Sequence, residues 1–430
     1  MTGAMYIKRC SPLVAMAVIM LLATACDTIG KENPDAMQRG DTKMHRSEKR
    51  GVSFDFRRMD DAMLLSEHVA WYYNWGPDCS SSTVDDYFEI DSVVFMPMAW
   101  NAGYNATRIT QYVQAHPECK YLLAYNEPNL TDQANMTPAK AAESWSALRA
   151  LAQSLGLKIV SPAMNYGTLS GYSDPIKWLD EFFAQPNVSS DDVEAIAIHC
   201  YMSSPSALES YVERFKKYGK PIWLTEFCAW DPAPSNVDTQ MDFMCSALNF
   251  LEQDEMVGRY AWFMPRAGIA VDKTPFMQLL THTTPSELTD LGKMFCAFST
   301  FDKSVWLDSK RGVAAKDYVA TCHNNIQIRP STEAEGEMMV TNLRTQEWLE
   351  YQVYVPAGSK EVNFIYATVL NSLLLVEVDG QLLSVLDLPK TGSMSNWSTM
   401  SGAINIKHGR HTVRLQVGDG TLNFAKFAIK

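Results

Sequence analysis

The chain has 430 residues, of which 47% are hydrophobic and 20% are charged, and its formal net charge is −12. This length allows two or three domains with at least one large core, and the composition is that of a soluble globular protein. The acidic balance disfavours nucleic acid and anionic membrane surfaces as partners and leaves neutral ligands open.

The N-terminus has the pattern of a targeting segment. Two basic residues precede the apolar run 13–23, which is short for a membrane span. Small residues then precede Cys26, an arrangement that resembles a bacterial lipoprotein signal with Cys26 as the lipidated first residue. Ordinary cleavage near Ala25 is the alternative. We predict a signal peptide over 1–25 and a flexible tether over 26–50. The protein would then be secreted or displayed at the cell surface, and the lipid anchor would be its only membrane contact.

From residue 51, short apolar runs alternate with helical stretches. The clearest helix spans 138–155, where Thr137 is a plausible cap and Pro138 fits the first turn. Near-continuous apolar strands that alternate with helices indicate a parallel sheet. Eight such units predict an α/β fold, a (β/α)8 TIM barrel over 51–305, close to the usual size of about 250 residues. The eight runs are 51–56, 68–75, 92–100, 121–127, 158–163, 193–201, 221–226 and 259–263.

The pattern changes after about residue 324. Helical runs give way to alternating stretches separated by turn signals such as Asp379-Gly380. This predicts an all-β domain, a jelly roll or β-sandwich, over 324–430, with 306–323 as the linker. The stretches are 349–355, 361–368, 373–378, 403–406, 411–417 and 422–429.

Two glutamates end predicted strands of the barrel. Glu127 follows the fourth apolar run and Glu226 follows the seventh. Active sites of this fold lie at the carboxyl ends of the strands, and strands four and seven face each other across the mouth. Hydrolysis of a glycosidic bond needs such a pair, one as acid and the other as nucleophile or base. Capping a loop or pairing with a surface base is the structural alternative for each.

Polar neighbours accompany both glutamates. Asn126 precedes Glu127 and could donate to a sugar 2-hydroxyl. His199 and Tyr201 lie two residues apart on the sixth strand and therefore project to one face. Tyr201 could hydrogen-bond Glu226. His199 could orient a carboxylate or a sugar hydroxyl, or it could be a satisfied histidine of the barrel.

Aromatic residues gather at or just beyond the strand ends, where sugar rings could pack on them. The four that we place in the substrate cleft are Trp75, Trp100, Trp230 and Trp262, and Trp71 and Tyr73 belong to the same group. A core role is the alternative at each position. The histidines show no metal-ligand spacing, and the sequence contains neither a glycine-rich phosphate loop nor a G-x-S-x-G motif. We predict no cofactor for catalysis.

Seven cysteines remain after Cys10 and Cys26 are set aside. An odd number without a close C-x-x-C pair argues against a zinc site and against a complete disulfide framework. Cys200 and Cys228 would lie near the ends of neighbouring strands and could pair, while isolated buried thiols are expected for most of the others.

A set of short motifs resembles glycoside hydrolase family 128 over residues 51–305. The motifs are Tyr72-Tyr73-Asn74-Trp75, Met96-Pro97-Met98, Tyr125-Asn126-Glu127-Pro128, Ser161-Pro162-Ala163, His199-Cys200-Tyr201 and Trp223-Leu224-Thr225-Glu226-Phe227. The resemblance implies a compact (β/α)8 barrel and retaining cleavage of β-1,3-glucan. It also implies that Glu127 is the acid/base and Glu226 the nucleophile.

The C-terminal stretch resembles family 6 carbohydrate-binding modules, on motifs that include Trp348-Leu349-Glu350-Tyr351, Leu388-Pro389-Lys390-Thr391-Gly392 and Leu422-Asn423-Phe424. That likeness implies that Trp397 and Asn423 hold sugar and that Glu333 or Glu335 helps to bind a structural calcium. The family's tryptophan after Thr-Gly-Gly is absent, because Ser393-Met394 stands there. A module that only packs against the barrel is the alternative.

Three functions follow from these observations. The first is a retaining hydrolase that cleaves internal bonds of β-1,3-glucan, with this polysaccharide as its partner. The second is another retaining hydrolase of the same clan A, acting on xylan or mannan. The third is a surface protein that binds glycans without catalysis.

Overall fold

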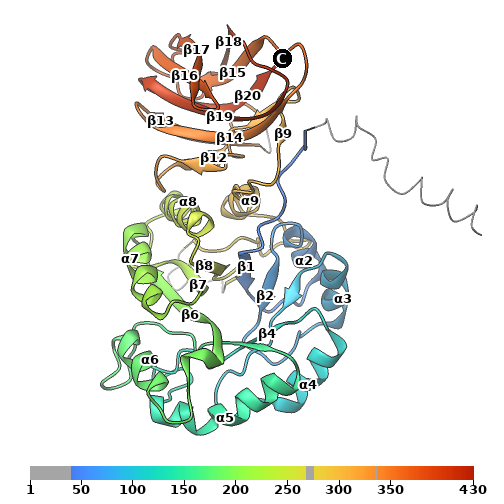
Figure 1. Ribbon diagram of the computed structural model, residues 1–430, viewed down its shortest axis with the longest axis vertical. Helices are drawn as coiled ribbons and strands as arrows, with labels where there is room; N and C mark the ends of the chain where they lie inside the picture. The colour runs from blue at the N-terminus through green and yellow to red at the C-terminus, as the bar shows by residue number, and fades with distance from the viewer. Residues whose placement is uncertain (1–39, 268–275, 335–336) are drawn as a thin grey trace, which may run out of the picture.

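The computed structural model describes residues 40–267, 276–334 and 337–430, and it contains two domains, one above the other in Figure 1. In the first, eight parallel strands follow the order β3-β2-β1-β8-β7-β6-β5-β4. Beyond β3, the Ala99 amide donates to the Leu123 carbonyl at 2.8 Å, and a parallel bridge joins Met98 to Leu123. These contacts close the sheet, and the predicted TIM barrel is confirmed. The strands are β1 (Arg50–Ser53), β2 (Trp71–Tyr73), β3 (Val94–Phe95), β4 (Tyr121–Leu123), β5 (Lys158–Val160), β6 (Val193–Met202), β7 (Ile222–Asp231) and β8 (Val257–Trp262).

Helices surround this sheet, and all of those named below except α2 and α3 begin after a residue whose side chain caps the first turn. The Thr137 hydroxyl accepts the Lys140 amide at 3.2 Å, and Pro138 occupies the first turn of α5. Asn105, Asp174, Ser204, Asn236 and Thr289 cap α4, α6, α7, α8 and α9 in the same way. The helices are α2 (Met59–Leu65), α3 (Ser82–Ile90), α4 (Ala106–Ala115), α5 (Pro138–Ser154), α6 (Pro175–Phe183), α7 (Pro205–Phe215), α8 (Val237–Gln253) and α9 (Asp290–Ala297).

The second domain is a β-sandwich, as predicted. One sheet follows the order β12-β13-β20-β15-β18 and the other β11-β14-β19-β16-β17. Alternate residues point into the core between them, where the Phe364 and Phe424 rings stack at 4.3 Å. The strands are β11 (Ala320–Thr321), β12 (Gln327–Pro330), β13 (Met338–Arg344), β14 (Trp348–Val355), β15 (Glu361–Ala367), β16 (Ser372–Val378), β17 (Gln381–Leu388), β18 (Ser398–Ala403), β19 (Gly409–Asp419) and β20 (Thr421–Ile429).

Two segments differ from the expectation. Residues 306–323, predicted as a linker, contain β9 (Leu307–Asp308), β10 (Val313–Ala314) and β11, which pair with strands of the sandwich and extend both sheets. A strand was expected over 403–406, but β18 comes earlier and ends at Ala403. The residues of β18 are mostly polar and exposed, so the hydrophobic pattern does not reveal this strand.

The sandwich packs against the barrel through β12, which lies on α8 and α9 (Figure 1). The buried Asn249 amide of α8 donates to the carbonyls of Asn324 and Ile326, both at 2.9 Å, and its oxygen accepts the Tyr318 hydroxyl at 2.9 Å. Arg329 of β12 pairs with Asp242 of α8. These polar contacts fix the orientation of the module on the barrel.

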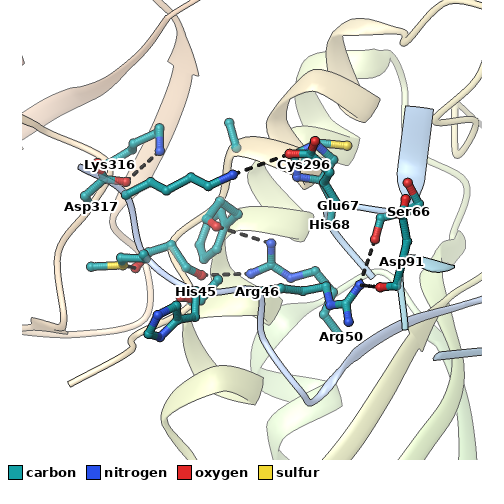
Figure 2. A pocket seen from close by; sticks show the side chains of 16 residues that line it. His45, Arg46, Arg50, Ser66, Glu67, His68, Asp91, Cys296, Lys316 and Asp317 are labelled. Atoms are coloured by element: carbon teal, nitrogen blue, oxygen red, sulfur yellow. Dashed lines mark hydrogen bonds and ion pairs between the residues drawn. The ribbon is translucent and has the colours of Figure 1, made fainter. Parts of the chain in front are cut away.

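Residues 26–50 were predicted to be a flexible tether, but the part from residue 40 onward is anchored. The Arg46 guanidinium donates to the carbonyls of Ser66 and Asp91 at 2.9 and 3.0 Å, which ties the segment to the ends of α2 and α3. Figure 2 shows these bonds at the edge of a cavity of about 480 Å³ between the barrel and the loop that carries Lys316. The predicted signal peptide, Cys26 and the rest of the tether lie outside the described residues.

A buried ion pair joins Arg50, the first residue of β1, to Glu252 of α8. Glu252 of α8 accepts the Arg50 guanidinium at 2.8 Å, the Tyr260 hydroxyl at 2.5 Å and the Ser47 hydroxyl at 2.8 Å. Arg50 is 1% exposed, so its charge depends on this carboxylate. Removing one partner of such a pair leaves an uncompensated charge in the interior.

We therefore expect Glu252→Ala to lower the free energy of unfolding by about 3–5 kcal/mol, measured by urea denaturation. The control is Glu194→Ala, since Glu194 forms an exposed pair with Lys158 at 2.7 Å and its loss should cost about 1 kcal/mol or less. Equal losses in the two variants would contradict the special role of the buried pair.

All seven cysteines of the described residues are free thiols, Cys200 and Cys228 included, so the disulfide considered for those two does not form. Burial raises the pKa of the Cys200 thiol to about 12, which keeps it protonated and unreactive. Within the described residues, no helix is both long and apolar enough to cross a bilayer.

Candidate active site

The two predicted glutamates meet at the carboxyl ends of the barrel strands. Glu127 lies in the loop that follows β4, where its amide donates to the Ala163 carbonyl at 3.0 Å and its φ of +43° is in the left-handed region. Such a conformation is uncommon outside glycine and clusters at functional sites. Glu226 lies within β7 rather than after it, because β7 continues to Asp231. Both side chains are buried.

The two carboxylates are close together. One carboxylate oxygen of Glu127, one of Glu226 and one ring nitrogen of His199 all lie within 4.8 Å of one another. Retaining glycosidases hold their carboxyl groups about 5–5.5 Å apart, whereas inverting enzymes need about 6.5–9.5 Å to admit a water molecule. The close approach of the two nearest oxygens favours direct attack by a carboxylate on the sugar.

His199 of β6 lies between the two glutamates and is fully buried. Its Nδ1 is 2.9 Å from Oε1 of Glu127 and its Nε2 is 3.5 Å from Oε1 of Glu226. Burial lowers the pKa of His199, but the charge of Glu226 and the hydrogen bond with Glu127 outweigh it and raise the pKa above its ordinary value. His199 is thus an electrostatic link between the carboxylates.

The Glu127 carboxylate receives a second donor that we did not predict. Burial raises the pKa of Glu127, but the hydrogen bond and charge of His199, together with a hydrogen bond from Asn165, outweigh burial and lower it. The Asn165 Nδ2 is 2.9 Å from Oε1 of Glu127. Asn126 is also buried beside this group, and its Nδ2 donates to Gln133 at 3.2 Å.

Three donors hold Glu226. The Tyr73 hydroxyl and the Trp75 indole nitrogen donate to Oε1 at 2.8 and 2.7 Å, and the Tyr201 hydroxyl donates to Oε2. Burial and then the charge of Glu226 raise the pKa of both phenols well above their ordinary value, so they stay protonated as donors. The carboxylate is therefore fixed in orientation by β2 and β6 together.

A cleft of about 580 Å³ opens above the glutamates. Trp75, Phe263, Tyr201 and Trp230 form a continuous aromatic wall, with ring centroids 6.0 Å apart for Trp75 and Phe263 and 5.6 Å for Tyr201 and Trp230. Trp100 and Asn126 also line the cleft. Exposed aromatic faces beside polar groups are suited to sugar rings.

Two tryptophans of the predicted aromatic group do not line the cleft. Trp262 is fully buried beneath it, where its indole nitrogen donates to the Met277 carbonyl at 2.8 Å, and its neighbour Phe263 faces the cleft instead. Trp71 lies at the opposite end of the barrel, since its indole nitrogen donates to the Lys49 carbonyl at 3.1 Å just before β1. Trp262 and Phe263 are consecutive, so their side chains point to opposite faces of the strand, but the sequence does not show which of the two faces the cleft.

The sequence analysis also missed Asn165 and Gln133. Both lie in loops after β4 and β5, where no periodic pattern marks an inward-facing side chain. The position of these loops at the carboxyl ends of barrel strands is the signal that could have drawn attention to them.

The predicted sugar ligands of the second domain differ in exposure. Trp397 is partly exposed, and its indole nitrogen donates to the Thr332 hydroxyl at 2.9 Å. Asn423 is 4% exposed; its oxygen accepts the Thr341 hydroxyl at 3.0 Å and its amide donates to the Met394 carbonyl at 2.8 Å. Asn423 therefore braces the sandwich, and this burial does not fit the predicted contact with sugar.

The two predicted calcium ligands lie in the segment between β12 and β13. Glu333 is partly buried, and Glu335 lies outside the described residues. Within the described parts of the chain, the one group of three or more acidic, histidine or cysteine side chains that could hold a metal is formed by Glu127, His199 and Glu226. The calcium site stays a prediction.

Comparison with known proteins supports both domains. Residues 51–295 match the family model described as glycosyl hydrolase catalytic core. The chain is similar to a solved endo-β-1,3-glucanase of glycoside hydrolase family 128, subgroup II, from Pseudomonas viridiflava, with 37% identity and a TM-score of 0.53 over 58% of this chain and 98% of that one. The corresponding Sorangium cellulosum enzyme is 32% identical, with a TM-score of 0.52 over 58% and 97% of the two chains.

The chain is also similar to a curated protein, alkali-sensitive linkage protein 1 of Schizosaccharomyces pombe. The two are 27% identical over 212 residues, which cover 47% of this chain and only 36% of the length of that protein. Residues 323–429 match the model described as carbohydrate binding module, family 35. This corrects the resemblance to family 6. The motifs used for that assignment are mostly short strand and turn patterns, which a β-sandwich of another family can share.

Proposed function

We propose that this chain, which belongs to the glycosyl hydrolase catalytic core family and to glycoside hydrolase family 128, cleaves internal β-1,3-glucosidic bonds of β-1,3-glucan with retention. The chain is a glycoside hydrolase. The observation that carries the mechanism is the pair of buried carboxylates, each with one oxygen within 4.8 Å of an oxygen of the other.

In the first step, Glu226 attacks the anomeric carbon, and the bond to the leaving oxygen breaks as Glu127 protonates that oxygen. Tyr73, Trp75 and Tyr201 hold the attacking carboxylate in place, so little reorganisation is needed when the new bond forms. The product is a glycosyl ester of Glu226 and a shortened glucan with a free hydroxyl.

In the second step, Glu127 is a carboxylate and acts as the base. It takes a proton from water, and the water oxygen attacks the anomeric carbon and releases Glu226. Two inversions give net retention of the β configuration.

His199 couples the two steps through charge. In the free enzyme the negative charge of Glu226 raises the pKa of His199. When Glu226 forms the ester, this charge disappears and the imidazolium loses its stabilisation. The pKa of His199 should therefore fall when the ester forms and rise again when Glu226 is released.

The shape of the cleft supports cleavage within a chain. It contains both glutamates and four aromatic side chains in contact with one another, which offer packing area for more than one sugar ring. The similar solved enzymes from Pseudomonas viridiflava and Sorangium cellulosum are endo-β-1,3-glucanases. The family 35 module, held on α8 and α9, would keep the enzyme on the polysaccharide, and the partly exposed Trp397 is its aromatic candidate for sugar contact.

A panel of polysaccharides tests this function. The enzyme should release a ladder of oligosaccharides from linear and branched β-1,3-glucans, and NMR should detect the β anomer first. Early release of a single short product would indicate attack at chain ends. Cleavage of xylan or mannan would favour the second hypothesis, and binding of laminarin without turnover would favour a non-catalytic protein.

At the N-terminus, we propose a lipid anchor at Cys26, because small residues precede this cysteine. Labelling of the protein with a radioactive fatty acid should then disappear in Cys26→Ala. We also propose that Glu333 or Glu335 helps to bind a structural calcium. Addition of chelator should then lower the melting temperature of the module, and an unchanged temperature would exclude the site.

A further inference from the structure

Asn165 lies in the loop between β5 and α6, and its side chain is held in one orientation. The Tyr166 backbone amide donates to Oδ1 of Asn165 at 2.8 Å. A backbone amide can only donate, so the oxygen of the side chain must face it. The Nδ2 group is therefore the end that faces Glu127, 2.9 Å from Oε1.

A second asparagine braces this loop from behind. Asn129 is fully buried, and its Nδ2 donates to the Asn165 carbonyl at 2.6 Å. The Leu169 amide donates to the Asn129 carbonyl at 2.9 Å. At Gly167, a Cβ atom would come within 2.5 Å of the Asn129 carbonyl oxygen, so a glycine is needed for the loops to approach. The loop after β5 is thus fastened to the loop that carries Glu127.

Both donors to Glu127 converge on one oxygen. His199 and Asn165 each contact Oε1, and in the described parts of the chain no hydrogen bond engages Oε2. A proton on Oε1 would displace one of these donors, whereas a proton on Oε2 displaces neither. Oε2 is therefore the oxygen that can carry a proton into the cleft.

We propose that Asn165 is a positioning residue for the acid/base: it holds Oε1 of Glu127, directs the catalytic proton to Oε2, and stabilises the carboxylate form that the second step needs. This assignment rests on the proposed function of Glu127. The role of Asn165 differs from that of His199. His199 contacts both glutamates, whereas Asn165 forms a hydrogen bond with Glu127 and none with Glu226.

The pH dependence of kcat/KM tests the assignment. Its basic limb reports the group that must be protonated, here Glu127. The Asn165 hydrogen bond lowers the pKa of Glu127, so its loss should move the basic limb to higher pH. The shift expected for Asn165→Ala is about one pH unit or more, since a bond to a charged group is lost. The acidic limb should stay in place.

Asn165→Asp provides a variant of the same shape. One carboxylate oxygen can still accept the Tyr166 amide, while the other meets Glu127 as a like charge and should shift the basic limb further than alanine does. Asn187→Ala is the matched control, because the Asn187 side chain donates to the Ala142 carbonyl at 2.7 Å and touches neither glutamate; it should leave the basic limb unchanged. A loss of rate without movement of the basic limb in both Asn165 variants would overturn the assignment.

A second measurement does not depend on turnover. Carbon-13 NMR of labelled glutamate side chains, with Glu127→Gln to assign the resonance, gives the titration midpoint of Glu127 directly. This midpoint should be higher in Asn165→Ala than in the wild type. An unchanged midpoint would refute the role of Asn165, whereas failure of the wild type to cleave any β-1,3-glucan would refute only the proposed function.

Discussion

Glu226→Gln should abolish the release of reducing ends from laminarin, with a fall in kcat of roughly 10⁴-fold or more. The amide is nearly isosteric with the carboxylate but cannot form the glycosyl ester that the first step requires. The three donors from Tyr73, Trp75 and Tyr201 surround this group on both oxygens. A reducing-sugar assay at substrate saturation gives the measurement.

The control is Glu194→Gln, a change of the same chemistry on the exposed edge of β6, where the rate should be unaltered. Circular dichroism should show the same fold for both variants. Full activity of Glu226→Gln would show that Glu226 is not the nucleophile.

Glu127→Gln should impair the enzyme in a way that depends on the leaving group. Polysaccharide has a poor leaving oxygen that must be protonated, so its cleavage should fall by about 10²–10⁴-fold. An aryl β-glycoside with an acidic phenol needs no proton, so its first step should proceed at nearly the normal rate. A burst of phenol followed by slow turnover is expected, because the amide cannot act as base in the second step.

Azide provides a further test of Glu127 as the base. Azide needs no general base to attack the anomeric carbon of the glycosyl ester, so it should restore turnover of the aryl substrate by Glu127→Gln and yield the β-glycosyl azide. The same azide should do nothing for Glu226→Gln on the β-linked substrate. Equal losses on polysaccharide and aryl substrate would show that Glu127 does not act as the acid.

The two variants together probe the electrostatic link through His199. His199 lies 2.9 Å from Glu127 and 3.5 Å from Glu226, and the charges of both raise its pKa. Loss of the charge at either glutamate should therefore lower the pKa of His199. This coupling is the physical reason why a single buried histidine can serve both steps of a retaining reaction.

Much of the architecture follows from local patterns. The eight apolar runs and their intervening helices correspond to β1–β8 and the surrounding helices, because burial on both faces leaves a continuous hydrophobic signal in each strand. The two glutamates interrupt this signal at strand ends, where a charged residue is costly without a partner. β18 escaped detection for a different reason: most of its residues are exposed, so the strand shows no alternation of buried apolar and exposed polar residues.

The sequence by itself determined the barrel, the position of Glu127 and Glu226 at its mouth, and the kinds of side chain beside them. Only the tertiary structure decided which side chains touch. Trp75 reaches Glu226 across 151 positions of the chain, and Asn165 reaches Glu127 from a neighbouring loop. It also decided that Phe263, and not Trp262, faces the cleft and that Asn423 is internal. The physical reason is that periodicity records burial along one element, whereas a contact depends on how barrel closure and loop packing orient elements that are distant in sequence.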